Sequence, residues 1–351
     1  MKRRELLGLG VLAGALASCR QLGLPGSIGV NQAPHDLEVW WSEGYYPEET
    51  DAIESIFSDW ERQSRKKLKL TFFSENEIAA KAQSVLNGGP IPDVLYGYGI
   101  NDTTVPALSF QNQLVPLDDI VRPLSNDLLP GVLDGITYLN RATGTKAVYG
   151  APLSQHSVNL HYWKDLLEEA TGIPGTAMIP DDWNGFWRFW LDCQRKLRDR
   201  NYSDVFGIAL PMSSQARDTT YIFSFFLEAH SAQLVNQAGA LQISQPEIRE
   251  RIIEALRDYT NLYREKAVSP KATSWGDPDN NINFLSSLSL MTANPTLSIP
   301  GSQLSDEIAY FERLGSLPWP DRLDGQKLRS FDSIKQAVVF QGSNVEQSKS
   351  L

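Results

Sequence analysis

The chain has 351 residues, 42% of them hydrophobic and 21% charged, a globular composition that is long enough for two domains of about 100–200 residues each. Its formal net charge of −10 argues against nucleic acid and anionic lipid surfaces as partners. The two cysteines and four histidines show no spacing typical of zinc ligands, so the sequence predicts no metal site, no disulfide framework and no cofactor.

The first 19 residues have the pattern of an export signal. Lys2, Arg3 and Arg4 precede an apolar run over residues 6–17, which is too short to span a bilayer because a spanning helix needs about 20 apolar residues. Leu16-Ala17-Ser18-Cys19 resembles the lipobox of bacterial lipoproteins, so we expect residues 1–19 to be a signal peptide that ends at a lipid-modified Cys19. An ordinary signal peptide with an incidental cysteine is the alternative, and Arg3-Arg4 leaves both Sec and twin-arginine export open.

Residues 20–35 are rich in glycine, proline and polar side chains and predict a flexible tether. Strands and helices then alternate: the pattern predicts strands at 37–41, 68–72 and 92–96, a helix from Pro47 and a helix over 77–87. This alternation is typical of a parallel sheet covered by helices.

A second region begins near residue 150. Helices are predicted at 163–170, 182–199, 219–230 and 248–263, strands at 205–210, 288–291 and 314–318, and a hairpin at 234–243. Asp181 or Asp182 is a candidate N-cap for the second of these helices. Trp183, Trp187 and Trp190 share one stripe of that helix and are predicted to be core residues.

Several stretches, taken in order, resemble the extracellular solute-binding proteins of ABC importers, in the carbohydrate-binding family that includes maltose-binding protein. They are the strand at 37–42 with its helix, the sequence at 89–94, the sequences at 149–153 and 160–166, the sequence at 179–186, and residues 284–291 with Asn294-Pro295. One departure is a serine-rich 286–289 where relatives usually have a glycine. Another is that the chain stops soon after 337–340, where relatives usually continue, so we expect a C-terminally truncated chain.

The resemblance implies an α/β, two-lobed periplasmic-binding-protein fold of type II, with a mixed sheet and flanking helices in each lobe and a ligand cleft between the lobes. It implies a first lobe over 36–150, a second lobe over 151–298 and an incomplete return to the first lobe over 299–351. The implied function is to capture a sugar or oligosaccharide by hinge closure and to deliver it to the permease subunits. The protein would be a monomer, anchored by lipid on the periplasmic or extracellular face of the cytoplasmic membrane.

Sugar binding needs aromatic rings that stack on C–H faces and polar groups that pair with hydroxyls. Residues of these types at strand ends and crossing segments are candidate ligand contacts, because open α/β sheets bind ligands there. The candidates are Trp41, Glu43, Tyr45, Tyr46, Tyr96, Tyr98, Asn101, Asp102, Gln155, His156, Trp275, Asp277, Asn294, Thr296 and Trp319. Surface packing, a solvated His156 and helix capping by Asp277 are the structural alternatives.

An enzyme that cleaves sugars would need two carboxylates about 5–10 Å apart across the bond. The adjacent acids Asp118-Asp119, Glu168-Glu169 and Asp181-Asp182 do not meet that need, because neighbours on a helix point in different directions. The sequence also has no G-x-S-x-G elbow, P-loop or zincin motif. We therefore predict a binding protein, with a sugar sensor or a secreted carbohydrate-active enzyme as alternatives.

Overall fold

The computed structural model describes residues 35–44, 47–175, 178–236, 239–329 and 332–351. The predicted export signal with Cys19, the tether up to residue 34, and the candidates Tyr45 and Tyr46 lie outside the described residues. None of the helices in the described ranges is long and apolar enough to cross a membrane. Residues 35–351 form one unit.

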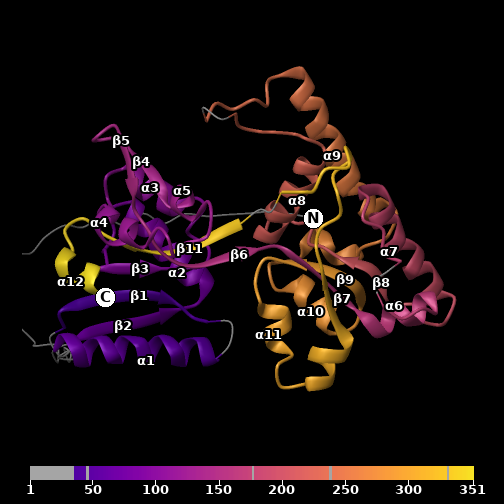
Figure 1. Ribbon diagram of the computed structural model, residues 1–351, viewed down its shortest axis with the longest axis horizontal. Helices are drawn as coiled ribbons and strands as arrows, with labels where there is room; N and C mark the ends of the chain where they lie inside the picture. The colour runs from indigo at the N-terminus through magenta and orange to yellow at the C-terminus, as the bar shows by residue number, and fades with distance from the viewer. Residues whose placement is uncertain (1–34, 45–46, 176–177, 237–238, 330–331) are drawn as a thin grey trace, which may run out of the picture. The chain divides into compact units, whose positions relative to one another are not determined.

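The first sheet has the strand order β2-β1-β3-β11-β6 (Figure 1). β1 (Leu37–Ser42) pairs in parallel with β2 (Leu68–Phe73) and with β3 (Val94–Tyr96), as the alternating sequence predicted. β11 (Asp332–Val339) runs antiparallel between β3 and β6 (Ala151–Ser157), which makes the sheet mixed.

Two helices connect the parallel strands of the first sheet. α1 (Pro47–Ser64) begins at Pro47 and has Glu48 and Glu49 in its first turn, where acidic side chains favour the positive end of the helix dipole. α2 (Glu75–Leu86) begins with a capping box of Ser74 and Glu77. Three short helices, α3 (Thr104–Phe110), α4 (Asp118–Val121) and α5 (Val132–Gly135), and the hairpin of β4 (Thr137–Asn140) and β5 (Thr145–Val148) complete this part of the chain.

The second sheet has the order β10-β7-β9-β8. Its strands are β7 (Asn159–Trp163), β8 (Phe206–Ala209), β9 (Ser289–Asn294) and β10 (Leu314–Leu317). Its helices are α6 (Lys164–Thr171), α7 (Trp183–Arg198), α8 (Arg217–Ala229), α9 (Pro246–Arg264), α10 (Asp279–Leu285) and α11 (Ser298–Ser302). An antiparallel bridge between Val235 and Leu241 lies within the predicted hairpin.

Aromatic side chains fill the core around the second sheet. Trp183, Trp187 and Trp190 are buried together along α7, which confirms their prediction as core residues. Asp182 caps this helix by accepting a hydrogen bond from the Gly185 N–H at 2.8 Å. Trp163 stacks on Phe284 with ring centroids 4.9 Å apart. The strand and helix periodicity therefore predicted α6, α7, α8, α9, β8, β9 and β10, whereas α10 and α11 were not predicted.

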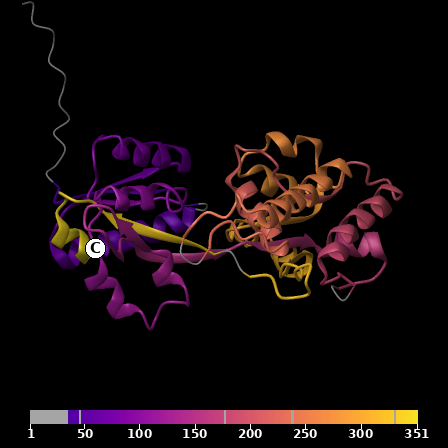
Figure 2. The ribbon, with the colours of Figure 1, turned by 90° about the horizontal axis from the view of Figure 1, so that it is seen from above.

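The chain passes between the two sheets twice. β6 leads into β7 with Val158 between them, and β11 returns the chain to the first sheet, as Figures 1 and 2 show. β10 pairs with β7, so residues 314–317 still belong to the second sheet, and the chain rejoins the first sheet with β11. The division of the chain near residue 298 remains a prediction.

The last element is the short helix α12 (Val345–Ser350). This helix packs on the first sheet's side of the molecule (Figure 1). Its contacts include a hydrogen bond from the Trp60 indole N–H to the Ser350 carbonyl at 3.0 Å and an ion pair between Lys349 and Asp119 at 2.8 Å.

Candidate functional site

A cavity of about 470 Å³ is lined by polar residues from the regions of both sheets, and we call it the polar cavity. Ser74, Glu75, Asn76 and Tyr98 belong to the region of the first sheet, and Lys335 comes from β11. The other side is formed by the start of α8, the turn before α10 with the first turn of α10, and the end of β9 with the loop that leads to α11. These segments contribute Gln215, Arg217, Asp218, Tyr221, Gly276, Asp277, Pro278, Asn281, Asn294, Pro295, Thr296 and Ser298.

Arg217 is the first residue of α8 and lies between two carboxylates. Its guanidinium forms an ion pair with Glu75 at the start of α2, and another with Asp277 at 3.4 Å. Burial alone would lower the pKa of Arg217, but the two carboxylates outweigh burial and raise it. Arg217 therefore stays charged and joins elements that are far apart in the sequence.

Helix capping was the structural alternative to a ligand contact for Asp277. Asp277 does cap a helix, and that helix is α8, which precedes it in the chain. The N-cap position of α8 is Ala216, which has no side chain that can accept a hydrogen bond. The Asp277 carboxylate accepts one from the Asp218 N–H at 3.0 Å instead. A carboxylate from the turn before α10 thus satisfies an amide at the start of α8.

Asp218 and Lys335 are buried ionisable residues in the cavity wall. Burial raises the pKa of Asp218 to about 8, and the Asp277 charge adds to the effect. Asp218 is therefore largely protonated at neutral pH. Lys335 is 6% exposed and its Nζ donates to the Tyr98 carbonyl and to the Ser333 hydroxyl, both at 3.0 Å. Burial lowers the pKa of Lys335.

The pairing of β11 with β6 explains why the Lys335 side chain points into the polar cavity. The register of the two strands shifts between Lys335 and Gln336, which is an irregularity of the β-bulge type. Bulges reorient side chains and are frequent next to functional sites. Ser333 and Lys335 lie two residues apart and so share one face of the strand, which brings their side chains within hydrogen-bonding distance.

A second cavity, of about 380 Å³, lies next to the polar cavity and shares Arg217, Tyr221 and Pro295 with it. We call it the side cavity. Asp102 and His156, both predicted site residues, line it. The Tyr221 hydroxyl donates to the Asp102 carboxylate. Burial lowers the pKa of His156, and the nearby Lys335 charge adds to this, so His156 is neutral at pH 7.

Asn294 and Thr296 lie at the carboxyl end of β9 and hold the loop that follows it. The Asn294 Oδ1 accepts from the Thr296 N–H at 2.9 Å and from the Thr296 hydroxyl at 2.8 Å. Its Nδ2 donates to Asn281 Oδ1 at 2.8 Å. Asn294 is 2% exposed, so much of its hydrogen-bonding capacity stabilises the cavity wall itself.

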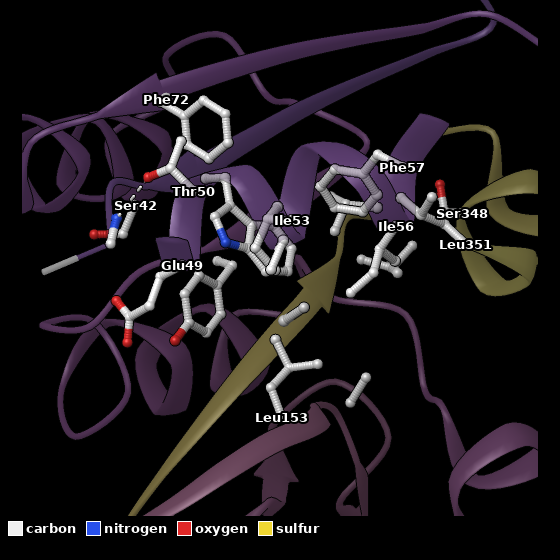
Figure 3. Close-up of a pocket in the computed structure, with 18 of the residues that line it drawn as sticks. Ser42, Glu49, Thr50, Ile53, Ile56, Phe57, Phe72, Leu153, Ser348 and Leu351 are labelled. Carbon is white, nitrogen blue, oxygen red and sulfur yellow. Dashed lines mark hydrogen bonds between the residues drawn. The ribbon is translucent and has the colours of Figure 1, made fainter. Parts of the chain in front are cut away.

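An apolar pocket of about 510 Å³ lies on the first sheet beside α1, and Figure 3 shows its lining. Trp41 and Tyr96 belong to this pocket and not to the polar cavity. Their rings stack with centroids 4.4 Å apart, and Trp41 meets Phe57 edge-on at 5.2 Å. Tyr98 lines both the apolar pocket and the polar cavity.

The remaining candidates lie away from the polar cavity. Trp319 stacks on Phe225 with centroids 4.2 Å apart and donates to the Val158 carbonyl at 2.8 Å. Trp275 is buried and lines another surface pocket beside α10. Asn101 donates to the Gly97 carbonyl at 2.9 Å and so holds the turn after β3. Glu43 is exposed at the end of β1, and Gln155 faces Ile334 across the β6–β11 pair.

The charged residues of the cavity were not predicted from the sequence; they are Glu75, Arg217, Asp218 and Lys335, together with Tyr221. One signal was present: Arg217-Asp218 is a charged pair directly before an apolar helix, which is unusual for a helix buried on several sides. Among the residues that the structure describes, no cluster of three or more histidine, cysteine, aspartate or glutamate side chains could hold a metal ion.

Comparison with known proteins identifies the family. The model of the bacterial extracellular solute-binding proteins matches residues 61–345, and the chain belongs to this family. Its members are binding proteins of the cell exterior, so the protein is an exported one. Among curated protein sequences, none matches the chain.

Solved structures of similar proteins have the same fold. A solute-binding protein of an ABC transporter from Thermotoga lettingae, bound to α-D-tagatose, has a TM-score of 0.71 at 19% identity over 90% of this chain and 76% of that one. Maltose-bound MalE3 of T. maritima has a TM-score of 0.69 at 16% identity over 89% and 75%. A D-mannitol-bound solute-binding protein from Agrobacterium vitis has 0.66 at 22% identity over 90% and 70%. The predicted two-lobed fold is thereby confirmed, with the first lobe around the first sheet and the second lobe around the second.

Proposed function

We propose that the protein is the substrate-binding component of an ABC importer, which captures a sugar, an oligosaccharide or a sugar derivative outside the cytoplasmic membrane and delivers it to the permease. Family membership supports the binding role. The tagatose, maltose and mannitol held by similar structures support a polyhydroxylated ligand. A sensor that presents the bound sugar to a membrane receptor is the alternative, and a secreted enzyme is a more distant one.

The polar cavity is the observation that carries this proposal. Among its described lining residues, the formal charges of Arg217 and Lys335 cancel those of Glu75 and Asp277 while Asp218 is protonated. Such a cavity has no net charge for an ionic ligand to neutralise, yet it is rich in donors and acceptors. An uncharged ligand with many hydroxyls fits this chemistry. Its volume lies within the roughly 300–1,000 Å³ that is usual for small-ligand sites.

Within this cavity we assign ligand contacts to residues from both lobes. Tyr98 offers a ring and Asp277, Asn294 and Thr296 offer polar groups, all four predicted from the sequence. Arg217, Asp218, Tyr221 and Lys335 are added by the geometry. Asp102 and His156 border the side cavity and would contact only a longer ligand.

Hinge closure is the proposed mechanism. The two lobes are linked through the β6–β7 segment and through β11, so rotation about these strands would open and close the cleft. A ligand that contacts both lobes binds the closed form more tightly and shifts the population toward it. The permease would then recognise the closed form, and the protein would act as a monomer.

Lipid attachment at Cys19 is proposed from the sequence. Such an anchor would keep the receptor on the outer face of the cytoplasmic membrane, with the tether giving it reach. Metabolic labelling with a radioactive fatty acid tests it: the chain should be labelled, and Cys19→Ala should not. Label in both chains, or in neither, contradicts lipidation at Cys19.

A sugar panel in a thermal-unfolding assay tests the binding role. A ligand at a hundred times its dissociation constant should stabilise the protein by about 2.7 kcal/mol. Scattering on the same samples should show compaction with the ligand that stabilises. If every sugar leaves both the unfolding temperature and the radius of gyration unchanged, the proposal fails. New reducing ends after incubation with oligosaccharides would favour the enzyme alternative.

A further inference from the structure

Two side chains of α8, Arg217 and Tyr221, contact the first lobe. Arg217 of the second lobe pairs with Glu75 of the first lobe. One turn further along the same helix, the Tyr221 hydroxyl bonds to Asp102, which follows β3. Residues four apart lie on one face of a helix, so a single face of α8 makes both contacts.

The absence of a side chain at Gly99 leaves room for Arg217 to reach Glu75. A Cβ built on Gly99 would overlap the guanidinium of Arg217. Gly99 lies in the turn after β3, three residues before Asp102, so the same turn of the first lobe meets both side chains of α8. The backbone of this turn and the face of α8 are therefore in close contact.

These contacts separate two cavities. The polar cavity lies on one side and the side cavity on the other, and they share Arg217, Tyr221 and Pro295. The shared residues include both side chains that bridge the lobes. The bridge is thus a wall inside the cleft, and a ligand confined to one side has about 470 Å³ available.

We propose that Arg217 and Tyr221 determine ligand size by forming a partition that divides the inter-lobe cleft, so that the site takes a short saccharide and excludes longer ones. This proposal rests on the sugar-binding function proposed above. A chain of sugars long enough to enter the side cavity must break the Arg217–Glu75 and Tyr221–Asp102 contacts before it can bind. That cost falls on long ligands alone, because a short one fits within the polar cavity.

Partial exposure makes the partition breakable. The Arg217 and Glu75 side chains are 33% and 30% exposed, so water screens their ion pair. Each contact therefore adds a modest barrier, and the two together discriminate between ligands without locking the cleft. Removing both should join the two cavities into one continuous cleft.

The test compares the full chain with the double variant Arg217→Ala, Tyr221→Phe. Tyr221→Phe removes the hydroxyl bond but keeps the ring. Arg195→Ala is the matched control, since it removes an arginine from an ion pair with Asp192 on α7, far from the cleft. Circular dichroism verifies that each variant is folded. The probes are maltose and the linear malto-oligosaccharides of increasing length, titrated by calorimetry.

In the double variant, affinity for the longer oligosaccharides should rise relative to affinity for maltose by about tenfold. The control should keep the length profile of the unaltered chain. An equal change at every length overturns the size restriction, because it means that Arg217 and Tyr221 are ordinary contacts.

A second measurement needs no ligand. Small-angle scattering of the ligand-free proteins should give a larger radius of gyration for the double variant than for the unaltered chain and the control. An unchanged radius of gyration would show that the Arg217 and Tyr221 contacts do not hold the two lobes together. If no sugar of the panel binds any chain while the radius still increases, the bridge stands and the proposed sugar-binding function is what has failed.

Discussion

The Asp277 carboxylate accepts a hydrogen bond from the backbone N–H of Asp218 at 3.0 Å, so a residue nearly sixty positions away caps α8. The same carboxylate lies 3.4 Å from Arg217. This arrangement fixes the start of α8 against the turn before α10 and sets the shape of the polar cavity. Asp277 therefore both caps α8 and lines the polar cavity.

Asp277→Ala should destabilise the protein and also weaken ligand binding. Loss of a capping side chain costs about 0.5–2 kcal/mol, and Arg217 loses one of its two carboxylates. Urea unfolding measures the first effect and calorimetry the second. Asp182→Ala is the matched control, since Asp182 caps α7 away from the cavity. It should lose similar stability with unchanged affinity; equal affinity in both variants would contradict a binding role for Asp277.

Asp218 should make stability fall as pH rises. Its pKa is about 8 in the folded chain and near 3.8 when exposed, so between these values the folded state holds a proton that the unfolded state has lost. Stability then decreases with pH across that window, because the native state binds more protons. Asp218→Asn removes this dependence and should gain stability relative to the unaltered chain from about pH 4 to pH 8.

Urea titrations of both chains at a series of pH values check the Asp218 prediction. Ionisable groups far from Asp218 contribute equally to both chains, so the difference in unfolding free energy reports Asp218 together with the charges that it contacts, such as Asp277 and Arg217. A difference that does not change with pH would show that Asp218 is ionised in the folded protein.

Lys335→Met should abolish most of the ligand affinity while leaving the fold intact. A hydrogen bond to a charged group contributes about 1.5–3 kcal/mol, which corresponds to tenfold or more in affinity. The methionine keeps the apolar stem of the buried side chain and removes its ammonium group. Lys327→Met is the control, because Lys327 is an exposed partner of Asp321 outside the cavity. Calorimetric titration with the best sugar of the panel should separate the two variants.

Trp319→Phe should affect stability and not binding. The indole donates to the Val158 carbonyl and stacks on Phe225, so the variant keeps a ring but loses one hydrogen bond, a loss of about 1 kcal/mol. Thermal unfolding measures this loss. The sequence predicted Trp319 as a ligand contact, and a drop in sugar affinity with unchanged stability would favour that original assignment over the packing role.

The sequence predicted the elements well wherever the signal is local. The period-two pattern of β1 and β2, the stripe of α7 and the Asp182 cap all depend on neighbours within one or two turns. The start of α8 was placed two residues late, at Thr219 instead of Arg217, because its cap comes from Asp277 and no local residue signals it. The hydrophobic periodicity of a sequence cannot predict a helix boundary that depends on tertiary contacts.

The site was predictable only in part for the same reason. Strand ends identified Tyr98, Asn294 and Thr296, since strand order brings such ends together. The faces that Trp41 and Tyr96 present depend on how α1 covers the sheet, and they proved to line the apolar pocket. Lys335 reaches the cavity from an antiparallel strand with an irregular register, and this register depends on pairing with Ser154, which is far away in the sequence.

Calorimetric titration of the full chain with a panel of neutral sugars and polyols, beside Lys335→Met, decides whether a neutral sugar binds in the polar cavity. We expect saturable, one-to-one binding of at least one compound to the unaltered chain, with affinity reduced tenfold or more by the substitution. Two results would contradict it: a folded chain that binds none of the compounds, or a sugar whose affinity is the same in both chains and therefore lies outside the polar cavity.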